Sequence, residues 1–132
     1  MKHNPIMVAF FAVTMLVGAT AVAGYRWGSE VVIDTNKRQA LGTMANVRAS
    51  GDSVQSIGCA VRTGNNGTSV SVVCYATDQT GLSVQCNSGQ PALLQAASAI
   101  TSNSHLVFRW DAPGTCTYLS VENYSSNAPI DP

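Results

Sequence analysis

The stretch from Gly58 to Thr77 reads GCAVRTGNNGTSVSVVCYAT. Its second half alternates polar and apolar residues, which is the pattern of a β-strand with one buried face. The Asn66-Gly67 pair near its centre predicts a type I′ hairpin turn, because that turn needs positive φ at both central residues and Asn-Gly tolerates it best. The stretch therefore predicts an antiparallel hairpin whose second strand buries one row of side chains: Val70, Val72, Cys74 and Ala76.

A two-residue loop at positions 66 and 67 also predicts which residues face each other across the hairpin. Residue 65 would pair with residue 68, and continuing that register brings Cys59 opposite Cys74. The register favours a Cys59–Cys74 disulfide, which leaves Cys86–Cys116 as the second bond. The other two pairings of four cysteines stay open, because sandwich proteins often use disulfides to link their two sheets instead.

Further short runs of alternating residues flank the hairpin. Leu106, Phe108 and Trp110 share one face of a run from His105 to Asp111. In the last run, we expect Cys116, Tyr118 and Ser120 on one face and Thr117, Leu119 and Val121 on the other. Other strand candidates cover 30–34, 41–48, 54–62 and 82–86, and turn residues separate the runs at 78–81, 87–91 and 112–114.

These runs predict an all-β fold, an antiparallel β-sandwich of about seven or eight short strands that is immunoglobulin-like in architecture and holds two disulfides. Pro113 and Gly114 suit the two central positions of a type II turn. Residues 92–100 fit two structures: they follow Pro91 and are rich in Ala and Leu, as helices are, but everything around them is β, so we expect a strand.

The N-terminus has the three parts of a secretory signal peptide. A basic start is followed by an apolar run from Ile6 to Val17 and by the small residues Ala21 and Ala23. We expect residues 1–23 to be removed after Ala23, with a retained N-terminal anchor as the alternative. The rest would be an N-terminal extension or first strand at 24–40, a β-sandwich core at 41–124 and a loose C-terminal tail at 125–132, with no membrane span after cleavage.

Composition narrows the class of protein further. Charged residues make up 11% of the chain and the formal net charge is zero, so there is no electrostatic footprint for nucleic acid. An even number of cysteines in a small exported domain predicts disulfides and an oxidising compartment. Zinc sites usually contain pairs of cysteines separated by two to four residues, whereas the four cysteines of this chain lie much farther apart in sequence. We therefore expect no metal and no cofactor, and a location in the periplasm, on the outer surface or outside the cell.

The segments around the cysteines resemble small exported proteins found in myxobacteria and related bacteria. The resemblance covers about residues 45–125 and rests on three segments, at 58–61, at 73–78 with Gly81, and at 114–121. It implies a β-sandwich and export, and the family has no assigned activity, so it brings no functional residues to this chain.

Side chains with catalytic potential are few. His105 is the only candidate base outside the signal peptide, and we expect it to be an exposed residue at the end of a strand. Asp78 and Asp111 fit the starts of turns, where a carboxylate accepts backbone N–H groups. We therefore expect no catalytic residue and a non-catalytic module that binds a protein or glycan at the cell surface, with Tyr25 and Trp27 as possible ligand contacts. The alternatives are a small hydrolase with an acid pair and an inhibitor presenting the loop 64–68.

Overall fold

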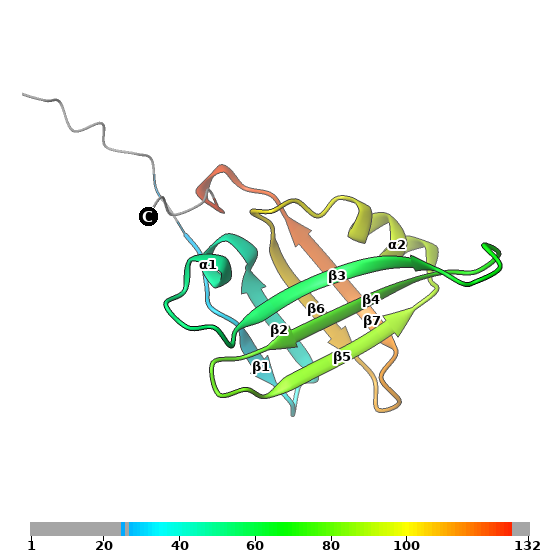
Figure 1. Ribbon diagram of the computed structural model, residues 1–132, viewed down its shortest axis with the longest axis horizontal. Coiled ribbons are helices and arrows are strands. Elements are labelled where there is room, and N and C mark those ends of the chain that lie inside the picture. The colour runs from blue at the N-terminus through cyan, green and yellow to red at the C-terminus, as the bar shows by residue number, and fades with distance from the viewer. Residues whose placement is uncertain (1–24, 26, 128–132) are drawn as a thin grey trace, which may run out of the picture.

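The computed structural model describes Tyr25 and residues 27–127, so the signal peptide expected at 1–23 lies outside the described residues. The chain forms two antiparallel sheets that pack face to face, which confirms the all-β sandwich (Figure 1). The elements are β1 (Val32–Asp34), β2 (Gln39–Thr43), α1 (Met44–Ala49), β3 (Ser56–Thr63), β4 (Val70–Thr77), β5 (Ser83–Ser88), α2 (Pro91–Ser98), β6 (His105–Trp110), β7 (Cys116–Glu122) and the 3-10 turn η1 (Ser125–Asn127).

The two sheets have four and three strands, in the orders β1-β2-β6-β7 and β3-β4-β5. This division into four and three strands is that of constant-type immunoglobulin domains, whereas the order of strands within each sheet differs. The three-stranded sheet is a simple meander. Side chains from the inner faces of both sheets form one core around Phe108, Leu106, Val72 and Cys74, all of them inaccessible to solvent.

The hairpin register predicted from the sequence is confirmed. Cys59 faces Cys74, and β3 and β4 pair without a shift from Ser56↔Thr77 to Thr63↔Val70. The prediction of a type I′ turn, however, is wrong: Gly67 has φ +70°, but Asn66 does not have positive φ. The Gly67 N–H bonds to the Gly64 carbonyl inside a four-residue loop, which preserves the same symmetric register.

Both predicted disulfides are present, and they have different roles. Cys59–Cys74 joins neighbouring strands of one sheet, whereas Cys86–Cys116 joins β5 to β7 and so links the two sheets. A β-bulge in β7 places the Cys116 side chain on the inner face of its sheet. Trp110 pairs with Cys116 and Arg109 with Tyr118, so Thr117 is the extra residue between them. The expectation that Cys116 and Tyr118 share a face is therefore wrong: Cys116 is buried, and Tyr118 lies outside.

Two segments expected to be strands form helices. The run 41–48 divides at Thr43, where β2 ends and α1 begins, with Ala45 and Val47 buried. Residues 92–100 belong largely to α2, which starts with Pro91 at its first turn and buries Leu93 and Ala97, one helical turn apart. This helix packs against β7, β3 and β4, so it closes one end of the sandwich between the sheets.

The turn at residues 111–115 also differs from its prediction. The Gly114 N–H bonds to the Asp111 carbonyl, so Ala112 and Pro113 are the central residues of the turn and Gly114 follows it with φ +89°. Positive φ at Gly114 is the part of the type II prediction that the structure retains. At the C-terminus, residues 125–127 form η1, and the rest of the expected tail, 128–132, lies outside the described residues.

Candidate functional site

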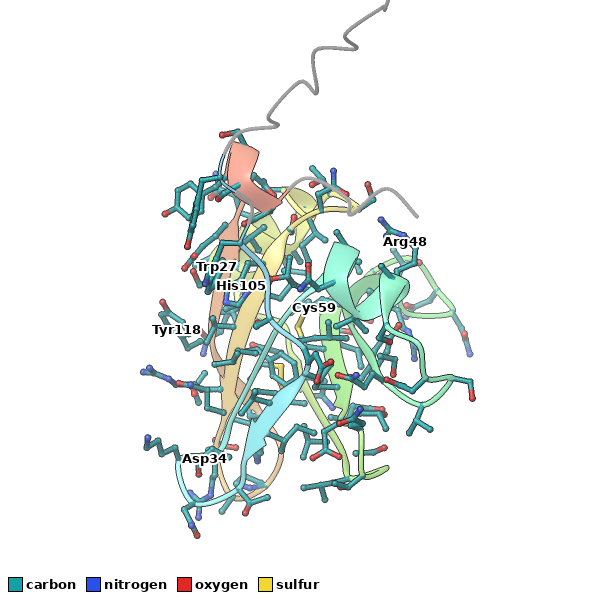
Figure 2. All side chains as sticks on the ribbon, turned by 90° about the vertical axis from the view of Figure 1, so that its left-hand side faces the viewer. Trp27, Asp34, Arg48, Cys59, His105 and Tyr118 are labelled. Atoms are coloured by element: carbon teal, nitrogen blue, oxygen red, sulfur yellow. A yellow bond between two sulfur atoms is a disulfide. The ribbon has the colours of Figure 1, made fainter. Side chains whose placement is uncertain are left out.

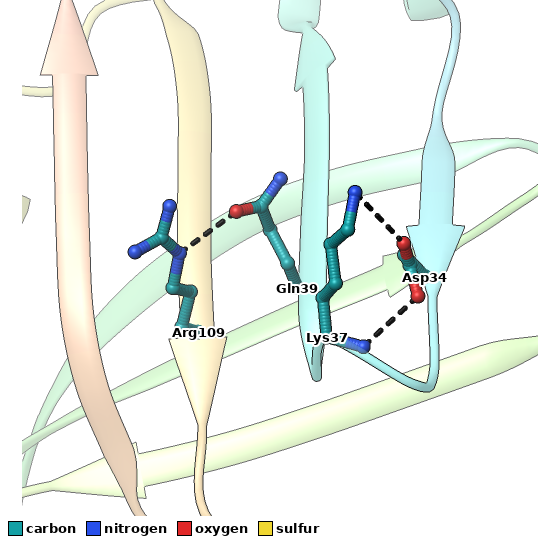
Figure 3. A network of polar contacts seen from close by, with 4 residues as sticks. All are labelled: Asp34, Lys37, Gln39 and Arg109. Carbon is teal, nitrogen blue, oxygen red and sulfur yellow. Dashed lines mark hydrogen bonds and ion pairs between the residues drawn. The ribbon is translucent and has the colours of Figure 1, made fainter.

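The outward-facing side of the four-stranded sheet is the candidate binding surface. In the view of Figure 3 the four strands of this sheet lie in front of the other sheet. Pairing across β1, β2, β6 and β7 arranges its side chains in three rows. We call this surface the outer face and define it by the rows Thr43, His105, Glu122; Val32, Leu41, Val107, Ser120; and Asp34, Gln39, Arg109, Tyr118.

Trp27 packs against His105 in the first row. Its indole lies edge-on to the His105 imidazole, with 4.8 Å between the ring centroids. The backbone N–H of Trp27 donates to the Ser126 carbonyl at 2.9 Å, which holds the N-terminal segment against the turn that follows β7. Figure 2 shows Trp27 and His105 together near one end of the outer face. Trp27 is still 43% exposed, so part of the indole remains free for a ligand.

His105 begins β6, as expected, but the expectation that it is exposed is wrong: it is buried, because Trp27 packs against its ring. Its Nδ1 is hydrogen-bonded to Thr43 Oγ1 at 2.9 Å, and the same hydroxyl accepts the Ser29 N–H at 3.1 Å. Removal from solvent lowers the pKa of His105 below its usual value, and the Glu122 carboxylate opposes this shift. Thr43 is inaccessible to solvent, so its hydroxyl cannot meet a substrate as a nucleophile does.

The middle row is an apolar stripe across the sheet. Val32 is exposed at the edge strand, Leu41 and Val107 are half-buried, and Ser120 ends the row on β7. Isolated apolar side chains on a surface are ordinary. Here three of them lie side by side on neighbouring strands, between Trp27 at one end of the face and Tyr118 at the other.

The third row holds planar polar groups in a fixed arrangement. Arg109 donates from Nε to Gln39 Oε1 at 2.7 Å, and its guanidinium carbon lies 5.0 Å from the centre of the Tyr118 ring. Lys37 engages Asp34 twice, through its backbone N–H at 2.9 Å and its ammonium at 3.6 Å. Figure 3 shows that the terminal nitrogens of Arg109 take no part in these contacts, so they can donate to a ligand.

The two residues expected to contact a ligand are placed differently. Trp27 belongs to the outer face as described, whereas Tyr25 is 80% exposed just before it. Tyr118, Arg109 and Gln39 were not among the residues predicted to contact a ligand. The signal was present in the run 105–110, because the residues between Leu106, Phe108 and Trp110 must point outward. For Tyr118 there was no such signal, because the bulge at Thr117 interrupts the alternation of side chains in β7.

The aspartates predicted to start turns do so. Asp78 Oδ1 accepts the N–H groups of Thr80 and Leu82, and Asp111 Oδ1 accepts that of Thr115. Hydrogen bonds from the hydroxyl and N–H of Thr80 lower the pKa of Asp78. A lowered pKa favours the ionised form, which makes Asp78 a poor proton donor.

Asp52 holds the loop before β3 in the same way. It accepts the N–H groups of Gln55 and Val54, which lower its pKa to about 2. The side-chain amide of Gln55 completes the arrangement by accepting the Val31 N–H at 2.8 Å. Within residues 27–127, no group of three or more His, Cys, Asp or Glu side chains could hold a metal ion.

Comparison with known proteins gives no relative: no family model, curated protein or solved structure matches this chain. A search of the described residues for a helix long and apolar enough to cross a membrane also gives none. The two disulfides indicate an oxidising environment outside the cytoplasm.

Proposed function

We propose that this chain is a non-catalytic, exported binding module that holds a glycan chain on the outer face of its four-stranded sheet. One observation carries the proposal: two half-exposed aromatic rings, Trp27 and Tyr118, lie toward opposite ends of one sheet face, with an apolar stripe between them. Figure 2 shows both residues on the same side of the molecule. The signal peptide predicted from the sequence and the two disulfides support a location outside the cytoplasm.

The chemistry of the face suits a sugar polymer. A pyranose ring has an apolar side formed by C–H groups, which packs on an aromatic ring, and a rim of hydroxyls that needs planar donors and acceptors. Asp34, Gln39 and Arg109 supply such groups in the row that ends at Tyr118. Arg109 is already oriented by Gln39, so less side-chain entropy is lost when a ligand binds.

The first experiment is a pull-down with the oxidised domain, residues 24–132, offered to insoluble polysaccharides and to cell-envelope extract. We expect retention on a polysaccharide and its loss in Trp27→Ala and Tyr118→Ala. Tyr75→Ala is the matched control, because Tyr75 is 45% exposed, as against 44% for Tyr118, but lies on the three-stranded sheet. Equal loss in all three variants, or no retention on any polysaccharide, would overturn the glycan assignment.

The projecting hairpin favours a second candidate, an inhibitor of an extracellular enzyme. The loop 64–68 lies at the tip of β3 and β4, which extends beyond the rest of the sandwich (Figure 1). Val61 and Val70 near the tip are exposed, and Cys59–Cys74 joins the two strands. Retention of a single protease from the extract, abolished by replacing the loop with Gly-Ser but not by Tyr118→Ala, would favour this function over glycan binding.

The third possibility is a small hydrolase built on an acid pair. Its test is a screen of broad hydrolase substrates with the same oxidised domain. A turnover that disappears on substitution of two carboxylates, and persists in Tyr118→Ala, would replace the binding proposal with an enzymatic one.

A further inference from the structure

Three of the four cysteines lie side by side in one row of the three-stranded sheet. Cys74 on β4 faces Cys59 on β3 and, on its other side, faces Cys86 on β5. Only the first of these neighbouring pairs is bonded, because Cys86 is bonded to Cys116 on the other sheet. Cys74 therefore has two cysteine neighbours and a bond to one of them.

The neighbour that Cys74 does not bond is also within bonding range. Directly opposed residues in antiparallel strands have Cα atoms about 4.5 to 5.5 Å apart, and disulfides span Cα separations of about 4.4 to 6.8 Å. Directly paired residues also project from the same side of a sheet, so the Cys74 and Cys86 side chains both point into the core, where both are buried. A Cys74–Cys86 bond thus needs a change of side-chain rotamer and no new strand pairing.

Exposure determines where a reductant enters. Cys59 is partly exposed, whereas Cys74, Cys86 and Cys116 are almost fully buried. Of the two residues in this bond, Cys59 is the more exposed, so we expect a small thiolate to attack Cys59 Sγ and form a mixed disulfide there, while Cys74 leaves as the thiolate. The attack therefore releases the one cysteine that has a second partner beside it.

We propose that the two disulfides exchange through Cys74 when an external dithiol reduces Cys59–Cys74. The Cys74 thiolate attacks Cys86 Sγ, the Cys74–Cys86 bond forms, and the Cys86–Cys116 bond breaks with Cys116 leaving as a thiolate that takes a proton. The second thiol of the reductant resolves the mixed disulfide at Cys59. The dithiol is oxidised by two electrons, and the protein ends with one disulfide and two thiols, at Cys59 and Cys116.

The exchange changes how the two sheets are joined. Cys86–Cys116 connects β5 with β7, so its loss removes the disulfide cross-link between the sheets, while Cys74–Cys86 stays within one sheet. The strand β7 also carries Tyr118 and Glu122 of the outer face. The redox state of the surroundings would then determine whether the sheet that carries the outer face is tied to the rest of the sandwich.

The test uses the oxidised protein with the wild-type sequence, treated with limiting dithiothreitol, quenched with acid, alkylated and mapped by mass spectrometry after digestion. We expect a two-electron-reduced species with a Cys74–Cys86 cross-linked peptide and alkyl groups on Cys59 and Cys116. A two-electron-reduced species that keeps Cys86–Cys116 and carries label on Cys59 and Cys74 would overturn the proposal. So would a direct passage to the fully reduced chain.

A variant pair tests the geometry separately. In Cys59→Ala/Cys116→Ala only Cys74 and Cys86 remain, and we expect them to form a disulfide in air. In Cys59→Ala/Cys86→Ala only Cys74 and Cys116 remain, and we expect free thiols. Far-ultraviolet circular dichroism of both variants shows whether they are folded, and the mapping of the wild-type protein holds whether or not they fold.

Discussion

The indole of Trp27 lies edge-on to the imidazole of His105, and the two ring centroids are 4.8 Å apart. This contact joins the entering chain to the first row of the outer face, and it keeps water from a histidine that is only 4% exposed. Trp27 therefore has two roles that experiments can separate, a packing role towards His105 and a binding role towards a ligand.

Replacing Trp27 with Ala is expected to raise the pKa of His105 towards its usual value, because the imidazole gains access to water. Loss of the packed indole is expected to lower the free energy of unfolding by about 1–3 kcal/mol, since the ring is only partly buried. The pKa is measured by NMR titration of the domain 24–132, in which His105 is the sole histidine. Trp27→Phe is the control: a pKa as low as in the native domain would show that ring packing sets it.

Stability is expected to fall as the pH drops below 6.5, because His105 has a lower pKa in the folded chain than in the unfolded chain. The unfolded state then binds more protons in the window between the two pKa values, so the free energy of unfolding is highest above this window and decreases through it. Urea unfolding at pH 7.5 and pH 5 measures the effect. In the His105→Gln variant, the free energy of unfolding should no longer fall between pH 7.5 and pH 5. An unchanged fall in that variant would assign the effect to other groups.

The aspartates act in a lower and separate window. Hydrogen bonds lower the pKa values of Asp34, Asp52 and Asp78 in the folded protein, first among them those from Lys37, Gln55 and Thr80 respectively. The stability they contribute is present above about pH 4 and is lost as the pH falls through their folded-state values. Unfolding of the His105→Gln variant between pH 5 and pH 2 is expected to show this second decrease alone.

The Arg38→Gly variant is expected to be more stable than the native protein. Arg38 has φ +48°, in the left-handed region that costs a non-glycine residue about 1–2 kcal/mol. Glycine removes that cost but adds entropy to the unfolded chain, so we expect a net gain of about 0.5–1 kcal/mol. The matched control is Gly114→Ala at φ +89°, which should be destabilising. A lower urea midpoint for Arg38→Gly would show that the arginine side chain stabilises the turn.

The disulfide between the sheets is expected to contribute more to stability than the one within a sheet. Cys86–Cys116 closes a sequence separation of 30 and Cys59–Cys74 one of 15. Loop entropy alone then gives about 3.6 and about 3 kcal/mol respectively. Thermal unfolding of Cys86→Ala/Cys116→Ala and Cys59→Ala/Cys74→Ala measures the difference. A larger loss from the second pair would mean that packing around Cys59 outweighs chain entropy.

The alternation of side chains was enough to predict the sandwich and the β3–β4 register, because one strand period and one short loop determine which residues face each other. The same alternation was misleading in the two segments that form helices. Ala45 and Val47 are buried two positions apart although they belong to α1, and Leu93 and Ala97 are buried because α2 closes the end between the sheets.

The candidate site was harder to predict than the fold, because it combines strands that are distant in sequence. Gln39 and Arg109 are 70 positions apart and meet only once β2 pairs with β6. Tyr118 faces outward because Thr117 is an extra residue in β7, which simple alternation does not reveal. Of the residues on or against the outer face, Trp27 was the one predicted as a ligand contact, as an aromatic residue next to glycine ahead of the first strand.

The hydrogen bond from the Trp27 N–H to the Ser126 carbonyl places the two ends of the described chain beside each other. Adjacent ends are the geometric requirement for circular permutation, and the exposed tip of the β3–β4 hairpin offers a place for new termini. A permuted chain that joins residue 127 to residue 27 through a short flexible linker and opens between Asn65 and Asn66 should keep both sheets. Its new ends would emerge at the hairpin tip, so a label or solid support could be attached there with the outer face left unobstructed.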